Sequence, residues 1–72
     1  MEIRLFATLR DGRGKEADIP WNEGISGFDI LKKLDLEPED VKIFLINGVH
    51  NEPDTLLKPD DIIALFPAIG GG

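Results

Sequence analysis

Only one stretch of this chain, SGFDILKKLD at residues 26–35, spaces its hydrophobic residues as an α-helix does. The apolar stripe consists of Phe28, Ile30, Leu31 and Leu34. Ser26 can cap the start of the helix, Asp29 completes a capping-box pattern, and Pro38 cannot continue a helix interior. The chain therefore has room for one short helix, whose stripe indicates a core face rather than a ligand site.

The other hydrophobic runs follow the period of β-strands. Strands are predicted over residues 1–9, 15–21, 41–46, 49–52 and 62–67. The turn RDGRG joins the first two strands into a hairpin, and Asn47-Gly48 forms the tight turn of a second hairpin. The loop PDTLLKPDD is expected to hold a single helical turn with Leu56 pointing inward.

The predicted element order is β-β-α-β-β-β, which indicates an α+β fold with one helix packed on one face of a small mixed sheet. If the first and last strands lie parallel at the centre, Ile63 and Leu65 face the helix. This is the β-grasp arrangement of ubiquitin. We expect one domain over residues 1–66 and a flexible tail over residues 67–72.

Charge and composition narrow the partners of this domain. Fourteen acidic against eight basic residues give a net charge of −6, which disfavours nucleic-acid binding and suits partners with basic surfaces. The absence of cysteine excludes disulfides and thiolate metal sites. No apolar run reaches the length of a membrane span, so we expect a cytoplasmic protein without membrane contact.

The side chains show no convincing catalytic or metal-binding group. His50 stands alone beside the Asn-Gly turn, so a solvated histidine is the simplest interpretation. The pair Asp60-Asp61 and the cluster Glu37, Glu39 and Asp40 are explained by turns and helix caps. We therefore expect neither an enzyme nor an intrinsic cofactor.

The end of the chain, LFPAIGGG, is the remaining unusual feature. Taken alone, three terminal glycines could be a frayed terminus or a cloning remnant. However, glycine has no Cβ atom, so its backbone can approach the residues that line an active site closely. The segment could therefore also enter a partner's active site. Its carboxylate is ionised at neutral pH and needs activation before it can react as an acyl group.

Several segments together resemble the MoaD/ThiS family of ubiquitin-like sulfur carriers, which includes the small subunit of molybdopterin synthase. They are IRLFATLRD near the start, LINGVHNE, TLLKPDDIIALFP and the closing Gly-Gly. The resemblance covers essentially the whole chain. It departs from the family pattern in the third glycine and in KPDDI, where Pro59 replaces a glycine.

The resemblance implies that the Gly72 carboxylate is adenylated by an ATP-dependent, E1-like activating enzyme. A sulfur donor protein then converts it to a thiocarboxylate, which delivers sulfur to a biosynthetic enzyme. The start LFATLRD favours the small subunit of molybdopterin synthase, with the larger synthase subunit as partner. IGGG weakly favours the alternative of thiazole synthesis for thiamine, with thiazole synthase as partner.

We expect the partner to hold the tail and part of the sheet. The predicted partner-binding residues are Gly70, Gly71, Pro67, Phe66, Leu45 and Ile43, the last three forming an exposed patch if Phe44 and Ile46 point inward. The competing hypothesis is a non-catalytic β-grasp interaction module with an inert tail. Activation of the Gly72 carboxylate distinguishes the two.

Overall fold

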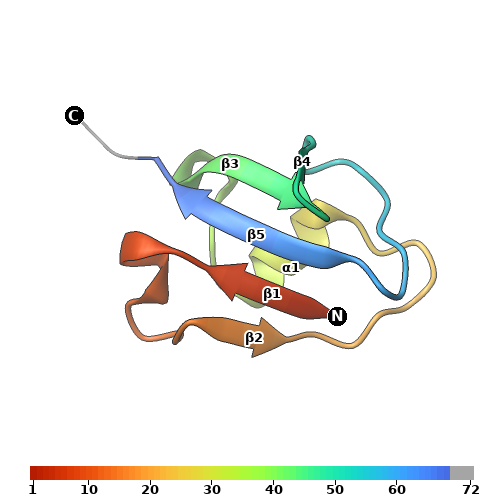
Figure 1. Cartoon of the computed structure of the whole chain (residues 1–72), viewed down its shortest axis with the longest axis horizontal. Helices are drawn as coiled ribbons and strands as arrows, with labels where there is room; N and C mark the ends of the chain where they lie inside the picture. Colours follow the sequence, from red (N-terminus) through yellow and green to blue (C-terminus); the bar gives the residue numbers. More distant parts are fainter. Residues whose placement is uncertain (69–72) are drawn as a thin grey trace.

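A five-stranded mixed sheet forms one layer of the fold, and one α-helix crosses behind it (Figure 1). The structure is a computed structural model and describes residues 1–68. The strands are β1 (Glu2–Leu5), β2 (Glu16–Asp18), β3 (Val41–Ile46), β4 (Val49–His50) and β5 (Ile62–Pro67), in the sheet order β2-β1-β5-β3-β4. The helix α1 spans Gly27–Lys33, and two short 3₁₀ helices are η1 (Ala7–Arg10) and η2 (Pro38–Asp40).

The centre of the sheet is the parallel pair of β1 and β5, as the sequence predicted. Leu5 lies opposite Leu65 in this pair, and β5 also pairs antiparallel with β3. The two predicted hairpins, β1–β2 and β3–β4, flank the centre. The predicted β-grasp topology is therefore confirmed.

The core lies between the sheet and α1. Ile3, Leu5, Ile63 and Leu65 of the central strands have no exposed surface, and Ile30 of the helix is equally buried. Phe44 and Ile46 of β3 also point into this core. The register predicted for β3 and β5 is thus confirmed, and it places their intervening residues on the helix-free face of the sheet, called the open face below.

The start of α1 matches its predicted cap, but its buried stripe differs from the prediction. The Asp29 carboxylate accepts a hydrogen bond from the Ser26 backbone N–H at 2.9 Å. Gly27 lies against the ring of Phe44, where a Cβ atom would be 2.6 Å from Cζ. This close approach turns Gly27, Ile30 and Leu31 toward the core and leaves Phe28 47% exposed, so the placement of Phe28 in the core was wrong.

The first strand is shorter than predicted. β1 ends at Leu5, and Ala7, with a φ of +51°, begins the 3₁₀ helix η1. This turn buries Leu9 and is held by the Arg10 guanidinium, whose Nε donates to the Leu5 carbonyl at 2.8 Å. The predicted strand over residues 6–9 was therefore wrong, because burial of Leu9 is achieved by folding the chain back.

The loop before β5 also differs from the prediction. Leu57 is buried and Leu56 is 69% exposed, which reverses the predicted orientation. The Leu57 N–H donates to the Ile25 carbonyl at 2.9 Å, and Leu56 forms an isolated bridge with Ser26. This strand-like pairing replaces the predicted helical turn, and it fixes which of the two adjacent leucines enters the core.

A polar network joins the β3–β4 turn to the start of β5. The side chain of Asn47 accepts from the Ile62 N–H and donates to Asp61, both at 2.9 Å. The buried Asp61 carboxylate also accepts from the Lys58 N–H at 2.7 Å. The prediction that turn chemistry explains Asp61 is confirmed.

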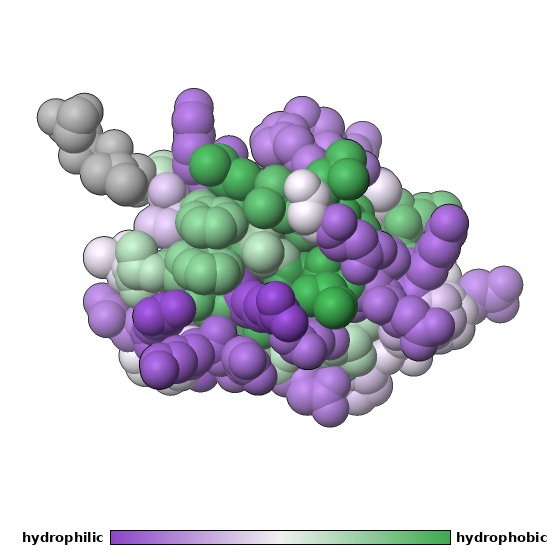
Figure 2. Space-filling view, viewed as in Figure 1, coloured by the Kyte–Doolittle hydropathy of each residue, from purple (hydrophilic) through white to green (hydrophobic). Residues whose placement is uncertain are grey.

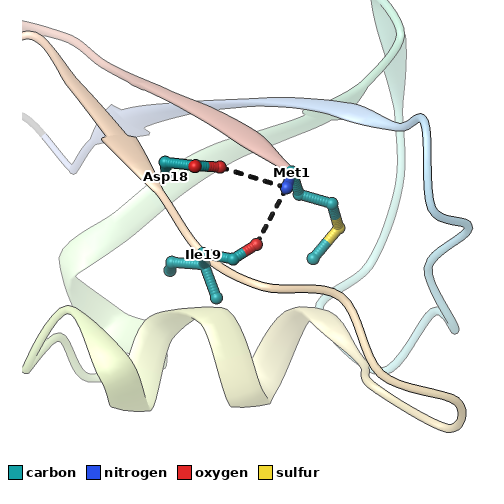
Figure 3. A network of polar contacts seen from close by, with 3 residues as sticks. All are labelled: Met1, Asp18 and Ile19. Atoms are coloured by element: carbon teal, nitrogen blue, oxygen red, sulfur yellow. Dashed lines mark hydrogen bonds and ion pairs between the residues drawn. The ribbon is translucent and has the colours of Figure 1, made fainter.

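At the other edge of the sheet, Met1 ties the start of β1 to the end of β2 (Figure 3). Its α-amino nitrogen donates to the Ile19 carbonyl at 2.8 Å and contacts the Asp18 carboxylate at 3.3 Å. The Ile19 N–H in turn donates to the Met1 carbonyl at 3.0 Å. These contacts extend the β1–β2 ladder by one residue.

Candidate functional site: the tail root and the open face

The last described residues, Phe66, Pro67 and Ala68, lie at the end of β5 and just after it, and are called the tail root below. Pro67 lies opposite Val41 in the β3–β5 ladder. The Ala68 N–H donates to the Asp40 carbonyl at 3.1 Å, so pairing continues to the end of the described chain. The predicted boundary at residue 66 stays a prediction, and the predicted site residues Gly70, Gly71 and Gly72 lie outside the described residues.

The open face beside the tail root carries an apolar patch made of Phe6, Ile43, Leu45, Ala64 and Phe66. The sheet register places Ile43 opposite Phe66 and Leu45 opposite Ala64, so the predicted patch residues lie together. Ile43 is 39% exposed, and the other members are partly buried. Figure 2 shows hydrophobic surface gathered over the middle of this face with hydrophilic residues around it.

Phe6 is a patch residue that the site prediction missed. Its ring stacks on that of Phe66 with centroids 4.3 Å apart and planes inclined by only 8°. Ile3 and Leu5 point into the core, and side chains alternate between the two faces of a strand. The alternation therefore places Phe6 on the opposite, open face, and this direction could be predicted from the sequence. What the sequence did not show is the contact with Phe66, which depends on the parallel pairing of β1 and β5.

Cationic side chains stand beside the aromatic pair. The Arg10 guanidinium lies over the Phe6 ring at 5.4 Å from its centroid, which suits a cation–π contact. Arg4, on the same face of β1, forms a hydrogen bond with Glu2, and this bond raises the pKa of its guanidinium. Arg13, the third arginine of the first hairpin, does not join this group.

Arg13 stabilises the end of α1 instead of facing the patch. Its Nε donates to the Leu34 carbonyl at 2.8 Å, and its terminal nitrogens reach the carbonyls of Leu9, Asp11 and Asp35 at 3.3–3.4 Å. A cation at a helix C-terminus also interacts favourably with the negative end of the helix dipole. This guanidinium is thus a structural bridge between the first hairpin and the helix.

Next to the tail root the open face is hollowed. The hollow is lined by Ala7, Lys42, Ile43, Phe66, Pro67 and Ala68. Most of this lining is apolar, and the ammonium-bearing side chain of Lys42 is its charged member. The hollow and the apolar patch share Ile43 and Phe66, so together they form one continuous surface around the point where the tail begins.

The polar side chains of the described residues do not gather into a metal site. Among residues 1–68, no group of three His, Cys, Asp or Glu side chains could hold a metal ion. Asp40 caps η2 by accepting from the Glu37 N–H at 2.9 Å, and His50 lies exposed in β4 opposite Leu45. Within the same residues, no helix has the length and hydrophobicity needed to cross a membrane.

Comparison with known proteins gives these surfaces a family context. The model of the ThiS family matches residues 3–72, which is nearly the whole chain. The chain belongs to the ThiS family. It is therefore a MoaD/ThiS-type sulfur carrier with a ubiquitin-like fold, a small protein that works together with an activating enzyme and a larger enzyme.

A solved structure has the same fold as this ThiS family member. That structure is described as molybdopterin converting factor subunit 1 of Pyrococcus furiosus, and this chain superposes on it with a TM-score of 0.76. The match covers 94% of this chain and 95% of that chain. At 21% sequence identity, the similarity shows a shared fold.

Proposed function

We propose that the carboxylate of Gly72 is the group that carries sulfur. The observation that carries the proposal is the family match, which extends through the terminal glycines to Gly72. The position of the tail root supports it. β5 ends beside an apolar surface suited to a protein partner, so a partner bound there would lie next to the tail root.

The proposed chemistry takes place in partner enzymes. A carboxylate oxygen of Gly72 attacks the α-phosphorus of ATP bound to the activating enzyme, and pyrophosphate leaves. A hydrosulfide ion supplied by a donor protein then attacks the acyl carbon, the bond between that carbon and the AMP oxygen breaks, and AMP leaves while the sulfur loses its proton to solvent. The product is a thiocarboxylate that a biosynthetic enzyme uses as its sulfur source, with ATP and the catalytic groups supplied by the partners.

The length of the tail limits how the partner can bind. Gly72 lies four residues after Ala68 in the sequence, and an extended chain of four residues spans at most about 14 Å. The reaction centre of the partner must therefore lie within this distance of the tail root. The body of the protein must dock closely, and the apolar patch is the surface that we assign to this docking.

For the destination of the sulfur we propose molybdopterin synthesis, with this chain as the small subunit of molybdopterin synthase. The segment LFATLRD supports this choice. Thiazole synthesis for thiamine is the second candidate, favoured by the ThiS family match and by the ending IGGG. Binding of the purified chain to the larger synthase subunit or to thiazole synthase would decide between them.

Mass spectrometry of the intact protein tests the proposed chemistry. After incubation with the activating enzyme, ATP and a sulfur donor, the mass should rise by the difference between sulfur and oxygen. A chain lacking Gly72, or extended beyond it, should show no rise because its carboxylate is misplaced. An equal rise in the extended chain would place the sulfur elsewhere and overturn the proposal.

A further inference from the structure

A β-bulge places one lysine at the tail root. In the β3–β5 ladder, Val41 lies opposite Pro67 and Ile43 lies opposite Phe66, so Lys42 is an extra residue between the two pairs. A bulge of this kind redirects a side chain relative to the regular alternation of a strand. Both Lys42 and Ile43 are exposed and line the hollow beside the tail, although they are neighbours in sequence.

Lys42 also stands where two hollows meet. One is the hollow at the tail root, and the other runs along the edge of β3 between Phe28, Pro38 and Pro53. Figure 1 shows β4 beside only the C-terminal end of β3, which leaves the Lys42 end of this strand at the edge of the sheet. A partner that covers the tail root would therefore pass over Lys42.

The charges around the tail root differ from those of the whole chain. The net charge of −6 predicts partners with basic surfaces. On the open face, however, Arg10 lies over Phe6 and Lys42 lines the hollow beside Phe66. The acidic residues Glu39 and Asp40 line a separate hollow at the tail root, which is shared with Arg13.

Lys42 has no ion pair of its own within residues 1–68. The ion pairs there join the Met1 amino group to Asp18 and Arg4 to Glu2. The Lys42 ammonium is thus a solvated cation at the rim of an apolar surface. Rim charges act mainly on the rate and the salt dependence of association.

We propose that Lys42 recognises a carboxylate side chain of the activating enzyme, located at the mouth of the channel that receives the tail. This inference rests on the proposed function, and it adds the charge of the group on the activating enzyme that contacts Lys42. The contact surface of that enzyme is acidic opposite Lys42, contrary to the expectation from net charge. Lys42 acts here as a recognition residue, and it takes no part in the chemistry at Gly72.

Charge reversal tests this inference. Lys42→Glu and Lys58→Glu change the net charge equally, but the exposed Lys58 precedes β5, at the end of that strand opposite the tail root. At low salt, Lys42→Glu should slow association with the purified activating enzyme by about tenfold, because steering by rim charges contributes factors of this order. Lys58→Glu should change the association rate by less than about twofold. Lys42→Arg keeps the positive charge, so its association rate should equal that of the unaltered chain.

The outcomes separate the inference from the proposed function. The defect of Lys42→Glu should shrink at high salt, where charge interactions are screened. The mass gain at Gly72 should remain when the activating enzyme is saturating, because Lys42 only assists encounter. Equal rates for Lys42→Glu and Lys58→Glu at every salt concentration would overturn the role of Lys42, whereas loss of the mass gain in the unaltered chain would overturn the proposed function.

Discussion

The two faces of β5 differ in burial: one face belongs to the core and the other is partly exposed. On the helix face, Ile63 and Leu65 are completely buried. On the open face, Ala64 and Phe66 are only partly covered, although they alternate with those residues along the strand. The comparison shows how a small sheet can hold its core with one face and present an apolar docking surface with the other.

The largest expected effect comes from the helix face. Leu65→Ala removes a fully buried side chain and should lower the free energy of unfolding by about 2–5 kcal/mol. Urea denaturation monitored by circular dichroism measures this loss. A loss below about 1 kcal/mol would mean that the core closes around the cavity, and would weaken the contrast between the faces.

A smaller effect is expected where the helix touches the sheet. The Cβ atom of Gly27→Ala would lie 2.6 Å from both the Phe44 ring and the Pro53 carbonyl. We expect a destabilisation of about 1–3 kcal/mol, as for other overpacked cores. Intrinsic helix propensity favours alanine over glycine by about 1 kcal/mol and would raise the melting temperature instead. A lower melting temperature for Gly27→Ala would show that overpacking dominates, and a higher one would show that helix propensity dominates.

The open face should show the smallest loss of stability and the largest loss of binding. Phe66→Ala removes the stacked ring and should lower the free energy of unfolding by about 1–2 kcal/mol, since the site is only partly buried. Affinity for the activating enzyme should fall more than about tenfold, as expected for an aromatic residue at the centre of an interface.

Leu56→Ala is the matched control for Phe66→Ala. It also truncates an exposed apolar residue, but one that lies in the loop before β5 and outside the patch. Isothermal titration should show unchanged affinity for this variant. If both variants bind equally well, the apolar patch is not the docking surface, and the contrast between the faces of β5 is one of burial alone.

Local signals predicted much of the fold. The Ser26–Asp29 cap, the Asn47-Gly48 turn and the alternation along β3 are encoded within a few residues, and each is confirmed. The exposed group of Ile43, Leu45 and Phe66 follows from that alternation, because the register fixes the face of every residue in the strand. Their role in binding a partner remains a proposal.

The wrong predictions concern residues whose direction depends on distant contacts. Phe28 fits a helical stripe, but the approach of Phe44 to Gly27 rotates it outward. Leu57 is chosen over Leu56 by a hydrogen bond to Ile25, which lies over thirty residues earlier. In each case two orientations satisfy the local pattern, and tertiary packing selects one.

The sequence by itself determined the element order, the β-grasp topology and the family, because these depend on periodicity, turn residues and motifs along the chain. Only the tertiary structure revealed the stack of Phe6 on Phe66 and the bulge that places Lys42 beside the tail root. The stack arises from the pairing of β1 with β5 at the two ends of the chain, and the bulge arises from the pairing of β5 with β3 in the middle of the chain. Such pairing sets contacts that no local pattern encodes.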